Sequence, residues 1–180
     1  GVWKTPLGNA LVDTRVATEF LRATDLLVAD ERAHQFEHSL EVLLPFLQYV
    51  KRDIKIVPLT IASRNLSHVR TVAESIAPLV RTLDITIICS SDMTHYESAK
   101  EARAKDMKAI QAIERLDEEA LATCVIQEDI SMCGFVAAYA SIIMAKLNGA
   151  RSGELVEYTN SGAVSGDHAN VVGYAGMVIS

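Results

Sequence analysis

The run Ile85-Thr86-Ile87-Ile88-Cys89 restricts the possible folds of this chain more than any other feature of its sequence. Isoleucine fills three of these five positions, and β-branched residues of this kind favour a strand. The polar residues Ser90-Ser91-Asp92 follow immediately and end the predicted strand. A second run, Ile54–Ile61, is nearly continuously apolar, which is typical of a strand covered on both faces. The sequence therefore predicts buried central strands with helices packed against them.

Helical patterns alternate with the strand patterns along the chain. The expected helices are Thr14 to about Ala23, His38–Val50 with a kink at Pro45, Asn65 or Ser67 to about Leu83 with a bend at Pro78, Ala99–Leu116, Asp117 to about Ile126, and Cys133–Leu147. The other expected strands are Asn9–Val12, Glu154–Thr159 and Val171–Ile179, of which the last two can pair antiparallel. Alternation of this kind is typical of an α/β protein. We predict one domain over residues 1–180, an α/β sandwich in which helices flank a mixed, mainly parallel central sheet.

Charge, composition and cysteine content exclude several classes of partner. The formal net charge is −6, no basic block occurs and only 6% of the residues are aromatic, so we expect neither nucleic acid nor an anionic membrane as a partner. No apolar run approaches the ~20 residues that span a bilayer. The three cysteines are odd in number and widely spaced, which predicts a reduced, cytoplasmic protein. The chain begins GVWKTPLG without a methionine, and we expect it to be the C-terminal part of a longer chain.

The loop after the strand at Ile85–Cys89 carries an acid and a histidine. In open α/β sheets, ligands bind beyond the carboxyl ends of the strands, and Ser90–Tyr96 follows such an end. Asp92 precedes His95 by three residues, so it can orient the imidazole, accept its proton or bind a metal ion beside it. Alternatively, Asp92 is a turn residue and His95 is a solvated loop residue. These residues alone leave both interpretations open.

Two further histidines lie in His34-Gln35-Phe36-Glu37-His38, which has the H-x-x-E-H spacing of an inverted zinc metalloprotease. That mechanism needs both histidines on one straight helix and a later acidic ligand. Pro45 interrupts the predicted helix, and the glutamates of Ala99–Leu116 lie on its solvated face, so the sequence disfavours a protease. His38 is then either a metal ligand or a structural residue of a first helical turn, held by a neighbouring carbonyl.

Cys133 is expected to begin an apolar helix, where amide donors and the helix dipole stabilise a thiolate. A thiolate at this position is either a nucleophile or a soft metal ligand. The alternative is that the Cys133-Gly134 step provides tight packing at the helix start. Cys89 and Cys124 are expected to be core thiols, one in a strand and one in a helix.

Four segments occur together: TPLG (5–8), EHSLEVLLPFLQ (37–48), SSDMTHY (90–96), and the Cys133-Gly134 step with the ending SGDHANVVGYAGMVI (165–179). In this combination and order, the chain resembles the MEMO family, also called AmmeMemoRadiSam system protein B, over nearly its whole length. The second and third segments form a specific pair. The resemblance implies an α/β sandwich similar to that of the LigB-type class III extradiol dioxygenases, built around a non-haem iron site.

The resemblance also implies roles for four residues. His38 and Cys133 are implied as metal ligands, and Asp92 and His95 are implied as catalytic acid/base groups beside the metal. Iron(II) is the first expected cofactor, with copper or zinc as alternatives, because imidazole and thiolate ligands suit these metals. The family's first pocket histidine lies in a His-Ala-Gly-Tyr-like segment that this sequence lacks. We therefore expect the metal site of this chain to be incomplete.

Three functions from different classes follow. The first is a metal-binding protein with non-haem iron-dependent redox or dioxygenase-like activity. The second is a catalytically silent pocket that binds a peptide or a small metabolite, which makes the protein an interaction module. A metal-independent hydrolase that uses Cys133 and His95 is a distant third. The family name further implies a pathway link to a radical-SAM protein. The sequence does not decide whether the chain is an enzyme.

Overall fold

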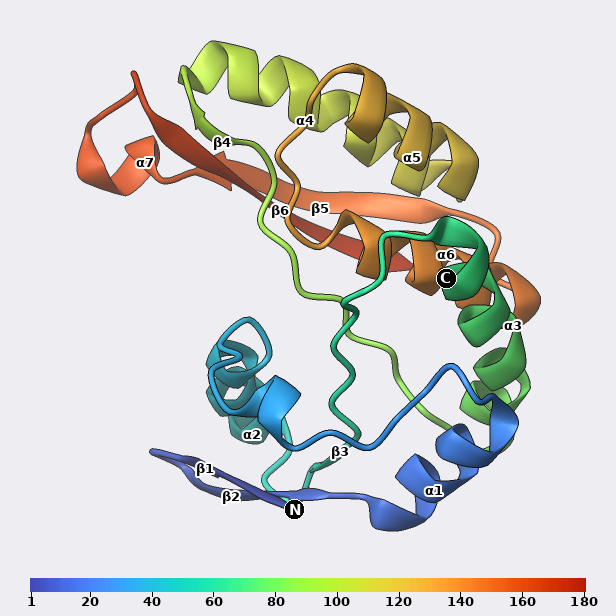
Figure 1. The fold of residues 1–180 in the computed structure, drawn as a ribbon. Helices are drawn as coiled ribbons and strands as arrows, with labels where there is room; N and C mark the ends of the chain where they lie inside the picture. Colours follow the sequence, from blue (N-terminus) through green and yellow to red (C-terminus); the bar gives the residue numbers. More distant parts are fainter.

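The computed structural model describes residues 1–180 and has an α/β architecture with two separate three-stranded sheets (Figure 1). In the first sheet, β1 (Val2–Thr5) and β2 (Gly8–Val12) form an antiparallel hairpin. The third strand of this sheet, β3 (Lys55–Ile56), pairs parallel to β2. A mixed sheet is therefore present, and the strand predicted at Asn9–Val12 is confirmed. The sheet is small, however, and lies at one end of the molecule (Figure 1).

The second sheet is antiparallel throughout, in the order β4-β6-β5. Its two long strands are β5 (Gly153–Asn160) and β6 (Val171–Ile179), which confirms the predicted closing pair. The connection between them contains the short helix α7 (Gly162–Ser165). The third strand, β4 (His95–Glu97), lies along the other edge of β6 and contains the last two residues of the predicted site loop, His95 and Tyr96.

The two predicted central strands do not form as expected. Only Lys55–Ile56 of the run Ile54–Ile61 is in a strand, and no residue of Ile85–Cys89 is. Strand formation requires a neighbouring chain that pairs its backbone groups, and these segments have none beyond β3. Their apolar side chains are nevertheless used, because Ile85 and Ile87 pack against a helical core. A mainly parallel central sheet is therefore not confirmed.

The helices agree better with the sequence, because their signals are local. They are α1 (Thr14–Ala23), α2 (Leu44–Val50), α3 (Leu66–Thr82), α4 (Ala99–Glu114), α5 (Glu118–Gln127) and α6 (Phe135–Leu147). Asn65 caps α3 by accepting the N–H of Ser67 at 3.0 Å, and Asp117 caps α5 by accepting the N–H of Ala120 at 2.8 Å. The sequence predicted Asp117 as a cap and gave Asn65 as one of two candidate caps for α3.

Two helix starts differ from the sequence prediction. The helix expected from His38 begins only at Leu44, after a 3₁₀ turn at Glu41–Leu43. Pro45 lies in the first turn of α2, where its missing N–H costs no helical hydrogen bond, so it starts a helix rather than kinking one. Helix α6 begins at Phe135, which leaves Cys133 just before the helix.

Two hydrophobic clusters make up the core, and α6 belongs to both. The first joins α1, α3 and α6 through residues such as Phe20, Ile76 and Ile143. The second joins α4, α5 and α6 and packs on β5 and β6 through residues such as Ile110 and Ile142. Ile142 and Ile143 are neighbours in the chain and are 0% and 3% exposed, so adjacent residues of α6 enter different clusters.

A polar network ties the same helices together at the surface of the core. Arg70 of α3 donates hydrogen bonds to Glu118 at 3.0 Å and to Glu119 at 2.8 Å, both on α5. It also donates to the Tyr139 hydroxyl of α6 at 3.0 Å. Lys146 of α6 bonds the other oxygen of Glu118 at 2.7 Å. Glu118 is nearly buried, so these partners supply the hydrogen bonds that water would otherwise make.

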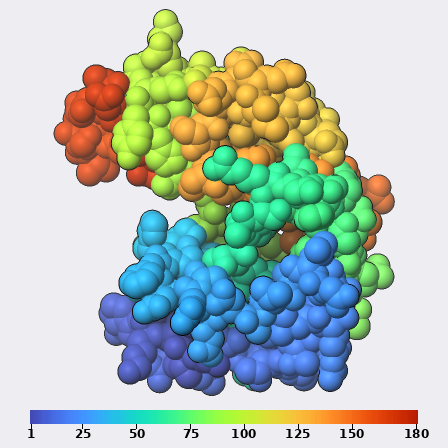
Figure 2. Space-filling model, viewed as in Figure 1, coloured from blue at the N-terminus to red at the C-terminus, as the bar shows by residue number.

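The overall shape is open on one side. Figure 2 shows a wide cleft between residues 1–50 and the upper part of the molecule, which contains α4 to α7 and β4 to β6. Two long coil segments, residues 57–64 and residues 85–92, cross the middle of the ribbon (Figure 1). None of the helices combines the length and the hydropathy needed to cross a bilayer.

Candidate metal centre

The segment of residues 92–95 brings Asp92 and His95 together, in agreement with one of the two interpretations that these residues left open. The Nε2 atom of His95 lies 3.5 Å from the Oδ2 atom of Asp92. The other ring nitrogen, Nδ1, lies 2.9 Å from the carbonyl oxygen of Ser131. A carbonyl can only accept, so Nδ1 carries the proton and donates it. Ser131 also accepts the N–H of His95 through its hydroxyl at 2.7 Å, and sequence reasoning gave no signal for this role.

Cys133 lies against the same loop. Its sulfur accepts the N–H of Asp92 at 3.3 Å and lies 3.9 Å from the hydroxyl oxygen of Ser91. The same hydroxyl accepts the N–H of Gly134 at 2.8 Å. Cys133 therefore meets Asp92 and His95 at one place, although it lies about 40 residues away from them in the sequence. Residues 131–133 hold this place from one side and residues 91–95 from the other.

Gly134 allows this contact. A Cβ atom at this position would lie 2.5 Å from the carbonyl oxygen of Ser90 and 2.6 Å from the Cβ atom of Ser91. Real Cβ atoms do not approach other atoms this closely, so any side chain here would force the two segments apart. The structural interpretation of the Cys133-Gly134 step, tight packing at the helix start, is thus correct, and it is compatible with a ligand role for Cys133.

His38 is linked to the site through its neighbour. The Ser90 hydroxyl donates to the carbonyl oxygen of Ser39 at 2.8 Å, which places the segment of His38 beside the start of the site loop. His38 itself is exposed and precedes the helical turn in which it was expected. Its imidazole makes no hydrogen bond and no ion pair. The structure therefore brings the segment to the site, but it does not bring the ring itself into contact with Asp92, His95 or Cys133.

The H-x-x-E-H spacing does not form a protease motif here. His34 ends a 3₁₀ turn and His38 lies in a coil, so the two histidines share no helix. The carboxylate of Glu37 accepts the N–H groups of Ser39 at 2.7 Å and Leu40 at 3.0 Å, and it also accepts the Ser39 hydroxyl. Burial opposes the charge on Glu37, but these hydrogen bonds outweigh burial and lower its pKa. Glu37 therefore fixes a turn.

The second cysteine near the site is Cys89. The residue as a whole is exposed, but desolvation around its sulfur raises the pKa of the thiol to about 11. A hydrogen bond from Ser141 opposes this shift, and the nearby Cys133 adds to it. The neutral thiol is thus the favoured form at Cys89, which disfavours a role as nucleophile. The residue is exposed and lies in no strand, however, so the prediction of a core thiol in a strand is wrong for Cys89.

A buried carboxylate supports the site loop from behind. Asp106 of α4 is 0% exposed and accepts the N–H of Thr94 at 2.9 Å and the hydroxyl of Tyr158 at 2.7 Å. Burial and the neighbouring Asp106 raise the pKa of Tyr158, so its hydroxyl stays a donor. Gly173 of β6 is needed here, because a Cβ atom would lie 2.0 Å from the Asp106 carboxylate. Thr94 immediately precedes His95, so Asp106 fixes the backbone that carries the imidazole.

The donor types at the site suit a transition metal, but the chain does not complete a coordination sphere. Imidazole and thiolate ligands fit iron, copper or zinc, and Cys133 and His95 supply one of each. No group of three or more histidine, cysteine, aspartate or glutamate side chains is placed to hold one ion. The described side chains therefore do not define a catalytic step at a metal ion.

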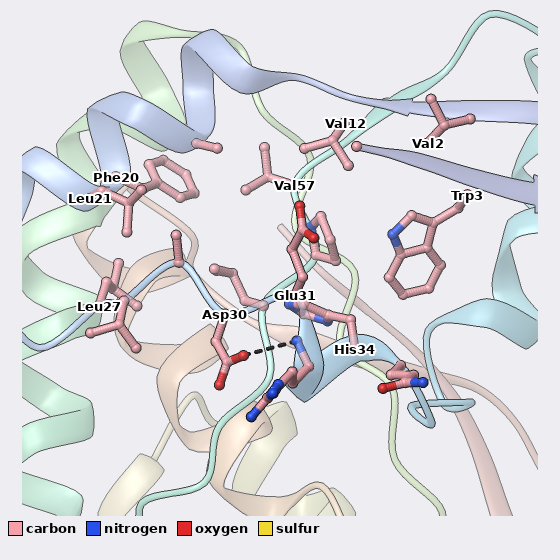
Figure 3. A pocket seen from close by; sticks show the side chains of 18 residues that line it. Val2, Trp3, Val12, Phe20, Leu21, Leu27, Asp30, Glu31, His34 and Val57 are labelled. Carbon is pink, nitrogen blue, oxygen red and sulfur yellow. Dashed lines mark hydrogen bonds between the residues drawn. The ribbon is translucent and has the colours of Figure 1, made fainter.

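A separate pocket of about 770 Å³ lies between β1, α1 and the coil that follows α1. Figure 3 shows Trp3 and His34 on one side of it and Phe20, Leu21 and Leu27 on the other. The rings of Trp3 and His34 meet edge to face with their centroids 5.9 Å apart. Eleven of the 18 lining residues are hydrophobic, and none of Asp92, His95 or Cys133 is among them. The pocket and the candidate metal centre are therefore distinct places.

Comparison with known proteins gives a single family. The chain matches the family model described as Memo-like protein over residues 1–178. It is 42% identical to MEMO1 family protein MK0963 of Methanopyrus kandleri, 41% identical to a MEMO1 family protein of Aquifex aeolicus and 42% identical to one of Methanosarcina acetivorans. These matches cover 98–99% of this chain but 64%, 66% and 67% of the relatives, respectively. The chain thus spans about two thirds of the length of these relatives.

Proposed function

Because this chain belongs to the Memo-like protein family, we propose that it supplies part of a metal-binding His/Cys pocket with non-haem iron-dependent redox or dioxygenase-like activity. Cys133 and His38 bind the metal, and Asp92 and His95 act beside it as acid/base groups. The metal is iron(II), with copper or zinc as alternatives. When bound, it supplies Lewis-acid and redox chemistry to a small substrate. The contact of Cys133 with the segment that carries Asp92 and His95 is the observation that carries this proposal.

The geometry supports a proton-carrying role for His95. Its Nδ1 is held by the Ser131 carbonyl at 2.9 Å, so Nε2 is the nitrogen left to take up or release a proton. Asp92 lies 3.5 Å from Nε2 and attracts the imidazolium that forms when Nε2 is protonated. His95 is only partly buried, which leaves it accessible to a substrate proton.

The geometry supports His38 as a ligand less directly. The 2.8 Å hydrogen bond between Ser90 and Ser39 holds the backbone next to His38 at the site, and the exposed imidazole is free to rotate. Rotation toward Cys133 would add an imidazole to the thiolate. Two ligands leave an ordinary transition metal with several open positions, which further protein groups, water or substrate can fill.

The test is metal binding by the protein at its full natural length. Cobalt(II) is the probe, because a thiolate ligand gives it a sulfur-to-metal charge-transfer band in the near ultraviolet. We expect Cys133→Ser to abolish this band and His38→Ala to weaken cobalt binding. The matched control is Cys124→Ser, which changes a half-buried thiol on α5 and should leave the band unchanged. Asp92→Asn and His95→Gln should each lower the affinity roughly 10–100-fold.

One result would refute the assignment directly. If Cys133→Ser keeps a charge-transfer band of unchanged intensity, the thiolate is not a ligand. A second outcome separates binding from activity. If Cys133→Ser loses the cobalt band but the iron(II)-loaded wild type consumes oxygen no faster than iron(II) alone, the metal site stands and the proposed redox activity is wrong. Anaerobic loading with iron(II), followed by oxygen uptake in an electrode cell, makes this distinction.

The apolar pocket favours a second function, that of an interaction module for a peptide or small metabolite. A volume of about 770 Å³ lies within the usual range of ligand pockets, and aromatic walls beside a few polar groups are typical of them. Trp3 is the only tryptophan of the chain and lies in the pocket, so it reports on occupancy. Energy transfer from Trp3 to anilinonaphthalene sulfonate should appear in the wild type and fall in Phe20→Ala. Equal transfer in both would count against a ligand in this pocket.

Two further predictions concern the family rather than this pocket. We propose that the mainly parallel central sheet of an α/β sandwich forms over the full length of the family members. We also propose that the protein is cytoplasmic and shares a pathway with a radical-SAM protein. The free cysteines support the cytoplasmic location, and the other name of the family supports the pathway link.

A further inference from the structure

Tyr96 has a backbone conformation that a tyrosine rarely adopts. Its φ is 60°, in the left-handed region, where the Cβ atom of any residue other than glycine crowds the following carbonyl oxygen. The other non-glycine residues with a positive φ are Asp84, Leu116 and Asp129, and each lies just after a helix, where a left-handed residue commonly ends the helix. Tyr96 lies in a strand, β4, so its conformation needs a different explanation.

A β-bulge is the cause of this conformation. His95 pairs with Val172 of β6. The next pair joins Glu97 to Val171, so two steps along β4 match one step along β6, and Tyr96 is the extra residue. Glycine is the usual residue at a left-handed bulge position, because it has no Cβ atom. The chain has a tyrosine there, at a cost in stability that glycine would avoid.

The tyrosine ring does not offset this cost through packing. Tyr96 is 79% exposed, and its hydroxyl makes no hydrogen bond to another residue. Its ring meets one other ring, the imidazole of His95, with the centroids 5.8 Å apart and the planes inclined by 51°. Successive side chains of a regular strand point to opposite faces of the sheet. The bulge therefore brings these two neighbouring rings side by side.

The imidazole beside Tyr96 is the proposed acid/base group of the site. Its Nδ1 lies 2.9 Å from the carbonyl oxygen of Ser131, so Nε2 is the nitrogen that acts on a substrate. An exposed ring that is held next to this imidazole, and that the fold does not use, is in position to contact the same substrate. Aromatic faces pack best against other flat groups, at centroid distances of roughly 4.5–7 Å.

We propose that Tyr96 is a specificity-determining residue, whose ring packs against a planar aromatic or conjugated group of the substrate on which His95 acts. This inference rests on the proposed function, because it takes His95 as the acid/base group. It explains why the bulge carries a strained tyrosine in place of glycine. The strain is retained because the ring serves the ligand and not the fold.

Urea denaturation of the protein at its full natural length tests the structural half of the argument. We expect Tyr96→Gly to leave the ratio of folded to unfolded protein unchanged or to raise it by up to about 30-fold, because glycine removes the strain. The matched control is Tyr174→Gly, at a tyrosine of the regular strand β6 that is 41% exposed. The control should lower the ratio at least about fivefold. If Tyr96→Gly lowers it as much as Tyr174→Gly, the ring supports the fold and the proposal is wrong.

Ligand binding to the cobalt(II)-loaded protein tests the functional half. The probes are benzoate and cyclohexanecarboxylate, which carry the same carboxylate on a planar ring and on a saturated ring. We expect the wild type to bind benzoate about 2- to 10-fold more tightly, as measured by changes in the visible absorption of cobalt. Tyr96→Gly should lose this preference, whereas Tyr96→Phe and Tyr174→Gly should keep it. The sulfur-to-cobalt band should persist in all of these variants.

The outcomes distinguish a failure of this inference from a failure of the proposed function. If the wild type does not bind cobalt, the proposed function is wrong and the role of Tyr96 falls with it. If cobalt binds but benzoate does not, or if Tyr96→Gly keeps the preference for benzoate, the role of Tyr96 alone is refuted and the metal site stands.

Discussion

Asp106 gives the sharpest prediction about the structure behind the site. Its carboxylate is fully buried and serves two donors, the N–H of Thr94 at 2.9 Å and the hydroxyl of Tyr158 at 2.7 Å. The Asp106→Ala variant removes both acceptors and leaves both donors in place. Thr94 is 0% exposed, so water cannot replace the lost partner of its N–H without opening the loop.

The magnitude follows from the number of donors left unpaired. Each buried donor without a partner costs about 1–3 kcal/mol, so Asp106→Ala should lower the free energy of unfolding by about 2–6 kcal/mol. Tyr158→Phe removes the hydroxyl that donates to Asp106, and it should lower the free energy of unfolding by about 0.5–2 kcal/mol. Asp106→Asn keeps an oxygen for Thr94 and can turn its amide toward the Tyr158 oxygen, so its cost should lie between these values.

Urea denaturation of the four members of a double-mutant cycle measures these quantities. We expect the Asp106→Ala and Tyr158→Phe costs to be non-additive by at least about 0.5 kcal/mol, because both remove the same hydrogen bond. If Asp106→Ala proves too unstable to study, Asp106→Asn replaces it in the cycle. A cost below about 1 kcal/mol for Asp106→Ala, or strict additivity, would refute the reasoning. A second readout is the NMR signal of the His95 ring, which should shift in Asp106→Ala.

Three further predictions concern individual residues. Gly134→Ala should lower the free energy of unfolding, measured by urea denaturation, by about 1–3 kcal/mol through overpacking. A Cβ atom at Gly176 meets nothing within 4 Å, so Gly176→Ala should lower it by less than about 0.5 kcal/mol, and equal costs would contradict the packing argument. The pKa of the Cys89 thiol is about 11, against an ordinary 9.0, so iodoacetamide at pH 8 should alkylate Cys89 roughly 100-fold more slowly than a free peptide thiol. Mass spectrometry measures this rate, and alkylation at the rate of the peptide would contradict the prediction. Arg70→Ala should cost about 1–2 kcal/mol, because Glu118 keeps a lysine partner and the arginine side chain is already 34% exposed, and calorimetry that shows no change would disprove this role.

Helix positions were predictable because their signals lie within a few residues of each other. Asn65 and Asp117 cap α3 and α5 as the sequence indicates, since an N-cap side chain bonds amides two or three residues later. The strand predicted at Ile85–Cys89 does not form. Its composition indicates an apolar environment, which Ile85 and Ile87 have, but a strand also needs a partner far away in the chain, and the local sequence does not contain that information.

The residues of the candidate site also differ in whether their contacts are local or connect distant segments. The pairing of Asp92 with His95 is local, and the sequence gave it as one of two interpretations, whereas Ser131 and Asp106 act through contacts between distant segments and were missed. Asp106 lies in a helix with many charged residues, and only its place on the buried side of α4 sets it apart. Cys133 was assigned to the site only through the resemblance to a family, because the local sequence alone could not distinguish a metal ligand from a packing residue.

The position of α6 limits which amino-acid substitutions this protein can accept during evolution. Ile142 and Ile143 fill opposite clusters from adjacent positions, so the helix cannot rotate or slide to accommodate a new side chain on one side without opening a void on the other. Any displacement along its axis would also move Cys133, which lies just before its first turn. Alterations that diversify the chemistry of such a chain should therefore accumulate in the loops facing the sulfur, while the helix behind it stays fixed.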